Sequence, residues 1–230
     1  MDQLQHESDV IGSRRPIATR AKRWPQSIAR GLVHAGLHPN HVSVASVVFA
    51  AVGGGALVAG AAQVGLPTSV WFVIAALAIQ GRLLCNLLDG LMAVEEGMAT
   101  TTGVLFNDVP DRLSDPILLV AAGYAGASMG DWMPALGWLA AVASLMVAYV
   151  RYVGGAEANW QDFSGPMAKQ HRMFVLTVGC VGAAAVSATS SSAWTPMVFC
   201  VALVVVIVGC AFTVVRRLRH IAGRLREVQP

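Results

Sequence analysis

Charged residues are scarce in this chain. Lys, Arg, Asp and Glu together make up 13% of its 230 residues, whereas hydrophobic residues make up 55%. This charged fraction is about half that of an ordinary soluble domain, which argues against a soluble globular protein. Strict alternation of apolar and polar residues is also absent, which argues against a membrane β-barrel. The composition therefore predicts a helical membrane protein.

Several catalytic and redox signatures are missing as well. The sequence contains no Gly-rich phosphate loop, no GxSxG, no HExxH and no CxxC pair. Its four cysteines lie singly within apolar segments, so we expect them to pack inside helices rather than to form disulfides. The first forty residues have no apolar core of the kind that a signal peptide requires, and we expect none.

Long apolar stretches are the main feature that is present. Most have a length near the roughly 20 residues that cross a bilayer core as a helix. They occupy residues 42–63, 68–93, 103–126, 133–153, 173–189 and 194–215. Six of the sixteen Lys and Arg residues precede residue 40 and five follow the last stretch, so the positive-inside rule places both termini in the cytoplasm. We expect an all-α integral membrane protein with six transmembrane helices in a bacterial-type inner membrane.

The polar segments divide the chain further. Residues 1–13 are predicted to be disordered, and residues 14–38 mix cations with apolar side chains, which predicts an amphipathic helix on the cytoplasmic leaflet. Residues 39–217 form the six-helix domain, with Asn40 expected to cap its first helix. Residues 218–230 form a basic cytoplasmic tail. The net charge of +3 fits attraction to anionic membrane lipid, and we expect no nucleic-acid partner.

Four oxygen-bearing side chains lie on either side of the short loop that joins the second and third stretches. Asn86 and Asp89 are three residues apart, and Asn107 and Asp111 are four apart, so each pair shares one helical face. The short loop makes the two helices antiparallel neighbours, which brings all four side chains to one depth near the cytoplasmic boundary. Oxygen ligands of this kind suit a hard cation, Mg²⁺ or Mn²⁺.

A structural alternative stays open for the two carboxylates. Arg82 lies one turn before Asn86, and Arg112 adjoins Asp111. These arginines offer Asp89 and Asp111 ion pairs that need no metal.

The segment that holds these residues resembles the signature of the CDP-alcohol phosphatidyltransferase family, D-x2-D-G-x2-A-R-x8-G-x3-D-x3-D. The spacing is preserved throughout, and the matching residues are Asp89, Gly90, Ala93, Gly103 and Asp111. Asn86 and Asn107 replace the first and third aspartates, and Val94 replaces the arginine. The segments LHPNHVS, AYVRYVGGAE and GPMAKQHR also resemble family segments, so the resemblance covers residues 25–215.

The resemblance implies an activity and a set of partners. Members of this family transfer the phosphatidyl group of CDP-diacylglycerol to an alcohol acceptor and release CMP, in phospholipid biosynthesis. A homodimer of six-span subunits embedded in membrane lipid is also implied. Asparagine keeps a carbonyl oxygen but supplies no charge, so the two substitutions predict weaker metal binding or a single ion. The sequence leaves the acceptor alcohol open.

The resemblance also implies roles for individual residues. Asp111 is the candidate base that takes a proton from the acceptor. The metal ligands implied, with a neighbouring aspartate added as a possible compensating ligand, are Asn86, Asp89, Asn107, Asp111 and Asp108. The residues implied to contact the CDP group are Asp89, Gly90, Ala93 and Gly103. The cations that would hold an anionic acceptor are Arg151, Lys169 and Arg172.

Two other interpretations are kept beside this one. The segment NDVPDRLSD also fits the NDxxDxxxD motif of prenyltransferases similar to the UbiA family, in which Asn107, Asp108, Asp111 and Asp115 would bind Mg²⁺ and a prenyl diphosphate. Six spans are too few for that family, and a second aspartate-rich motif is missing. The lost aspartates also fit a non-catalytic membrane subunit or scaffold related to the transferases.

Overall fold

The computed structural model describes residues 23–94, 97–98, 103–158, 160–189 and 192–228. Its elements in chain order are α2 (Arg23–His34), α3 (Pro39–Ala61), α4 (Thr68–Val94), α5 (Gly103–Ala125), the 3₁₀ turn η2 (Ala127–Met129), α6 (Trp132–Glu157), α7 (Lys169–Ser187), the 3₁₀ turn η3 (Ser192–Trp194) and α8 (Thr195–Val228). Within these residues the protein is all-helical, as predicted. The segment predicted to be disordered, 1–13, lies outside the described residues.

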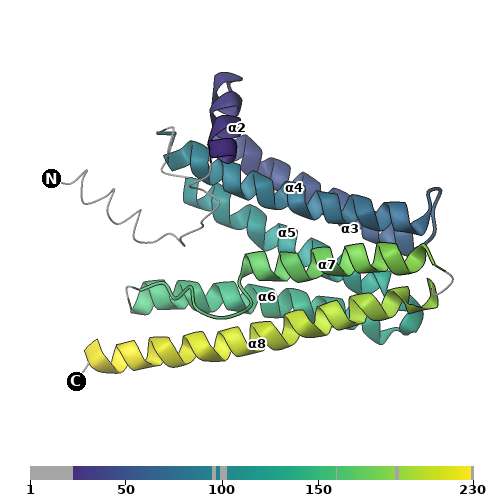
Figure 1. Cartoon of the computed structure of the whole chain (residues 1–230). Coiled ribbons are helices and arrows are strands. Elements are labelled where there is room, and N and C mark those ends of the chain that lie inside the picture. Colours follow the sequence, from purple (N-terminus) through teal and green to yellow (C-terminus); the bar gives the residue numbers. More distant parts are fainter. Residues whose placement is uncertain (1–22, 95–96, 99–102, 159, 190–191, 229–230) are drawn as a thin grey trace.

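The six longer helices form one closed bundle (Figure 1). Helix α3 packs against α4 and α5, α5 packs against α6, and α6 packs against α8. Helix α8 contacts α7, which returns to α4 and closes the ring. Phe72 of α4 and Phe199 of α8 are both buried and meet edge-to-face near the starts of these helices, with ring centroids 5.1 Å apart. The six helices occupy nearly the same residues as the six apolar stretches of the sequence.

Four of these helices are long and apolar enough to cross a membrane, judged by length and composition within the described residues. They are Pro39–Ala61, Thr68–Val94, Trp132–Glu157 and Thr195–Arg226. The other two, α5 and α7, carry several charged residues in their first turns. Helix α5 holds Asp108, Asp111, Arg112 and Asp115, and α7 begins with the polar turn KQHR.

Close helix approach depends on glycine where α5 crosses α6. A Cβ atom on Gly123 would lie 2.8 Å from the Cα atom of Gly137, and a Cβ on Gly137 would lie 2.9 Å from the Cα of Gly123. A side chain at either position would therefore push the two backbones apart. This contact sets α5 against α6 near the end of the bundle opposite the polar residues.

The start of α3 differs from the expectation that Asn40 caps it. The N-cap is His38, and Asn40 lies inside the helix after Pro39. Proline favours the first helical position because its fixed φ suits a helix and it has no N–H to satisfy there. The backbone N–H of His38 donates to Nδ1 of His41 over 3.3 Å, which is the bond that the third helical residue makes back to the N-cap in a capping box.

Helix α2 is the described part of the predicted amphipathic segment. Its Ala29 is buried in a small apolar cluster with Val42 of α3 and with Leu88 and Met92 of α4. Trp24, by contrast, is 48% exposed. At the other end of the chain, α8 continues to Val228, so the basic tail predicted for residues 218–230 extends the last helix as far as it is described.

Candidate functional site

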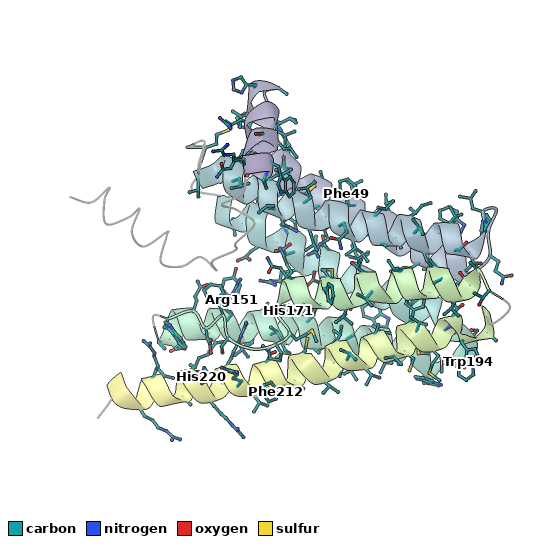
Figure 2. The ribbon with its side chains drawn as sticks, viewed as in Figure 1. Phe49, Arg151, His171, Trp194, Phe212 and His220 are labelled. Atoms are coloured by element: carbon teal, nitrogen blue, oxygen red, sulfur yellow. The ribbon has the colours of Figure 1, made fainter. Side chains whose placement is uncertain are left out.

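The polar side chains gather at one end of the bundle, where α4 and α6 end and α5 and α7 begin. Figure 2 shows Arg151 of α6 and His171 of α7 towards this end, and Trp194 at the opposite end. The order of the helices produces this arrangement, because α5 follows α4 after residues 95–102 and α7 follows α6 after residues 158–168. Four helix ends therefore contribute side chains to one site.

Asn86 and Asp89 lie on the same face of α4 and each has an oxygen without a partner. Asp89 is 3% exposed, and its Oδ2 accepts a hydrogen bond of 2.7 Å from the hydroxyl of Ser43 in α3. The Nδ2 of Asn86 donates to the backbone carbonyl of Arg82 over 3.0 Å. The Oδ1 atoms of both residues are buried and have no hydrogen-bond partner in the described structure. A buried oxygen without a donor is costly, so these two atoms are suited to bind a hard cation.

Asp111 and Asp115 of α5 are held by three cations from two other helices. Arg82 of α4 is fully buried, and its Nη2 lies 3.1 Å from Oδ1 of Asp111 and 2.7 Å from Oδ1 of Asp115. Lys169 of α7 contacts the other oxygen of Asp111. Arg172, one turn further along α7, reaches Oδ2 of Asp115 through Nη2 at 2.6 Å. Buried charges require such pairing, since an unpaired ion inside a protein is strongly destabilising.

The structural alternative considered from sequence is therefore found in part. Asp111 does pair with Arg82. Asp89, however, bonds to Ser43, and Arg112 pairs with Asp108 rather than with Asp111.

Asp108 belongs to a second, more exposed cluster that faces α6. Its Oδ1 lies 3.4 Å from Nη2 of Arg112 and 3.3 Å from Nη2 of Arg151. Both guanidinium groups lie near the ring of Tyr152, with 5.9 Å and 5.2 Å between each Cζ atom and the ring centroid. Arg151 also lies 5.7 Å from the ring centroid of Phe163. Aromatic faces attract guanidinium groups and help to fix their orientation.

The connection between α6 and α7 is fastened to α8, and this positions Lys169. Asp162 is buried in that connection, where its carboxylate accepts hydrogen bonds from the backbone N–H and the hydroxyl of Ser164, 2.7 Å and 3.0 Å long. Its Oδ2 lies 3.0 Å from Nδ1 of His220 in α8. Burial acts to raise the pKa of Asp162, but these contacts outweigh it and hold the pKa below its ordinary value of 3.8. Arg217 of α8 also donates to the carbonyl oxygen of Ser164 over 2.9 Å.

The remaining residues predicted for the site lie in the same region. Gly90 and Ala93 are on α4 just after Asp89, and Gly103 is the first residue of α5. The backbone of Asn107 is helical and lies one turn before Asp111, while its side chain lies outside what the structure describes.

Two of the predicted acceptor cations lie differently with respect to solvent. Lys169 is 27% exposed, whereas Arg172 is 2% exposed and also donates from Nη1 to the carbonyl oxygen of Met167.

Ser43 was missed as a site residue. The hydroxyl in LHPNHVS was its signal in the sequence, but only the packing of α3 on α4 brings it to Asp89.

Comparison with known proteins finds similar structures. The chain resembles crystal structures of the Mycobacterium tuberculosis phosphatidylinositol phosphate synthase PgsA1. For the structure with CDP-DAG bound, the TM-score is 0.69 at 23% identity, and the match covers 87% of this chain and 94% of that one. For the complex with manganese and citrate, the TM-score is 0.64 at 25% identity, covering 86% and 88%. The apo form also gives a TM-score of 0.64 at 25% identity, covering 84% and 93%.

These matches confirm the resemblance that the motif indicated. The synthase is a CDP-alcohol phosphatidyltransferase, and this chain shares its fold at 23–25% identity. No protein-family model and no curated protein sequence matches the chain.

Proposed function

We propose that this protein is a membrane phosphotransferase that moves the phosphatidyl group of CDP-diacylglycerol to an alcohol acceptor and releases CMP, in phospholipid biosynthesis. One observation carries the proposal. The motif residues Asp89 and Asp111 converge with Asn86 at one end of a helix bundle whose fold matches that of a CDP-DAG-binding synthase. The prenyltransferase interpretation is not favoured, since the structural matches are to a phosphatidyltransferase.

A divalent cation fits the unpartnered oxygens of Asn86 and Asp89. Mg²⁺ or Mn²⁺ bound there would neutralise the pyrophosphate and the CMP leaving group. Asn107, Asp108 and Asp111 remain the other candidate ligands. Gly90 and Ala93 lie near the end of α4 and Gly103 begins α5, and residues this small would let the CDP group approach the backbone there.

Asp111 is the proposed base, and its contacts suggest how it becomes active. Arg82 and Lys169 each contact one oxygen of the Asp111 carboxylate, so the hydroxyl group of an acceptor cannot reach either oxygen while both contacts hold. An anionic acceptor bound by Lys169 and Arg151 would compete with Asp111 for the ammonium group. Oxygen Oδ2 of Asp111 is then free to take the proton of the attacking hydroxyl, as the new P–O bond forms and the bond to CMP breaks.

Arg172 was predicted to hold the acceptor directly, and its position supports an indirect role. It is buried behind Lys169, where its guanidinium group binds Asp115 and the carbonyl oxygen of Met167. Asp115 in turn contacts Arg82, the partner of Asp111. We therefore assign Arg172 to positioning of the base, with Arg151 and Lys169 left to bind the acceptor.

The membrane arrangement is part of the proposal. We place all six helices α3 to α8 across the membrane, with both termini and the site on the cytoplasmic side. The exposed Trp24 on α2 supports a position for this helix on the cytoplasmic leaflet. A reporter fused after Pro230 that works only on the far side of the membrane would contradict this topology. A homodimer is also proposed, and crosslinking in native lipid tests it.

The experiment that tests the activity uses the full chain reconstituted in lipid nanodiscs. CDP-diacylglycerol, Mg²⁺ or Mn²⁺ and a panel of alcohol acceptors are supplied, CMP release is measured, and the lipid product is identified by mass spectrometry. We expect metal-dependent CMP release with at least one acceptor that carries a phosphate. Folded protein that releases no CMP with any acceptor would support the non-catalytic scaffold instead.

A further inference from the structure

The three buried carboxylates of the site are not equally available to a metal ion. Asp111 touches both Arg82 and Lys169, and Asp115 touches both Arg82 and Arg172. Asp89 makes no ion pair with any described residue and has only the hydroxyl of Ser43 as its side-chain partner. The two carboxylates of α5 are thus already neutralised by cations, whereas the one on α4 is not.

Two of the buried oxygens that lack a hydrogen bond belong to this carboxylate and to its neighbour Asn86. Oδ1 of Asp89 and Oδ1 of Asn86 both lack a hydrogen bond, and they are one helical turn apart on α4. One carboxylate oxygen and one amide oxygen at this spacing are ligands of the type that Mg²⁺ and Mn²⁺ accept, with water or substrate oxygens in the remaining positions. The structure therefore offers the ligands of one cation on α4.

Arg82 and Lys169 occupy the two carboxylate oxygens through which a second ion would have to bind Asp111. The guanidinium group of Arg82 is fully buried and lies between the carboxylates of Asp111 and Asp115. If Arg82 moved away, the buried carboxylates of Asp111 and Asp115 would each lose an ion-pair partner, which is costly. While Arg82 stays, an ion that approached Asp111 beside it would be repelled by its positive charge. Lys169 occupies the other oxygen of Asp111.

We infer that this site holds a single divalent cation, on Asn86 and Asp89, and that the side chains of Arg82 and Lys169 take the place of a second ion beside Asp111 before an acceptor binds. The inference rests on the proposed function for the use of the site, but the number of ions is measurable without turnover. The two side chains supply positive charge next to Asp111. The bound ion is left to neutralise the anionic substrate.

The test is a Mn²⁺ titration of the full-length protein in nanodiscs of zwitterionic lipid, without nucleotide, with free Mn²⁺ measured by electron paramagnetic resonance. We expect one Mn²⁺ per chain. Asp89→Asn should weaken its binding by about tenfold or more, at least as much as the loss of an outer partner of a metal site. Two ions per chain in the wild type, or unchanged affinity in Asp89→Asn, would overturn the inference.

A matched pair of variants tests the role of Lys169. Lys169→Met removes one of the two cations at Asp111 and frees Oδ2, the oxygen that Arg82 does not contact, so we expect a second Mn²⁺ to bind. Lys169→Arg keeps the charge and should still bind one. Thermal unfolding of both variants confirms that they are folded, which the partial exposure of Lys169 favours. A single Mn²⁺ in folded Lys169→Met would show that this side chain does not replace an ion.

The number of bound ions and the release of CMP are measured separately, so the single-ion inference and the proposed function can fail independently. One bound Mn²⁺ without CMP release would overturn the transferase proposal and leave the single-ion site standing. Two bound ions together with CMP release would do the reverse.

Discussion

Replacing Asp111 by Asn should separate catalysis from folding at this site. The substitution keeps the size of the side chain and removes the proton acceptor, and a general base contributes about 10²–10⁴-fold in rate. The structural cost is small by comparison. Arg82 still has Asp115 at 2.7 Å, and Lys169 is 27% exposed, so water can solvate its ammonium group. We expect a loss of about 1 kcal/mol in the free energy of unfolding.

Asp115→Asn is the matched variant. It should lower the stability of the protein more than Asp111→Asn does, and lower its activity less. Arg172 is 2% exposed and would lose its ion-pair partner, while the buried Arg82 would lose one of two. Leaving a buried charge without its partner costs about 3–5 kcal/mol. For a chain of this length the melting temperature should fall on the order of 10 °C. CMP release per folded molecule should fall less than in Asp111→Asn.

The assay measures CMP release and thermal unfolding on the same nanodisc preparations. Glu157→Gln, at an exposed carboxylate at the end of α6, controls for the loss of a charge and should change neither. Full CDP-dependent turnover in Asp111→Asn would show that Asp111 is not the base. A fall in melting temperature as large as that of Asp115→Asn would show that its loss of activity is structural.

Three further changes test other parts of the structure. Because the pKa of Asp162 is lowered in the fold, its ionised form stabilises the protein above about pH 4, and this stability is lost as the pH falls further. The melting temperature of Asp162→Asn should therefore fall less on acidification than that of the wild type. Gly123→Ala should destabilise the protein by about 1–3 kcal/mol in thermal unfolding, because the new Cβ would lie 2.8 Å from the Cα of Gly137. Gly55→Ala in α3 is the control and should be tolerated, because a Cβ there meets nothing within 4 Å. Asn86→Asp adds a formal charge at the unpartnered amide oxygen and should tighten Mn²⁺ binding in the same titration; unchanged affinity would argue against Asn86 as a ligand.

The sequence by itself determined the helices and the local geometry of the motif. Apolar stretches of membrane length form helices because each backbone polar group must be satisfied within its own segment, and this is a local requirement. The spacing of Asn86 and Asp89 placed both on one face of α4 for the same reason. The start of α3 was misjudged by the sequence analysis, because the preference of Pro39 for the first helical position outweighed the capping preference of Asn40.

Only the tertiary structure decided the partners of the charged residues. From sequence, Arg112 was as good a partner for Asp111 as Arg82, and Lys169 was expected at the acceptor rather than on the base. The contacts of Asp111 join residues 29 and 58 positions apart in the chain, so they exist only because α4 and α7 become neighbours of the start of α5. Ion pairs inside a bundle are set by which helix ends meet and by the need to neutralise every buried charge, and neither condition can be read from the spacing of residues within one helix.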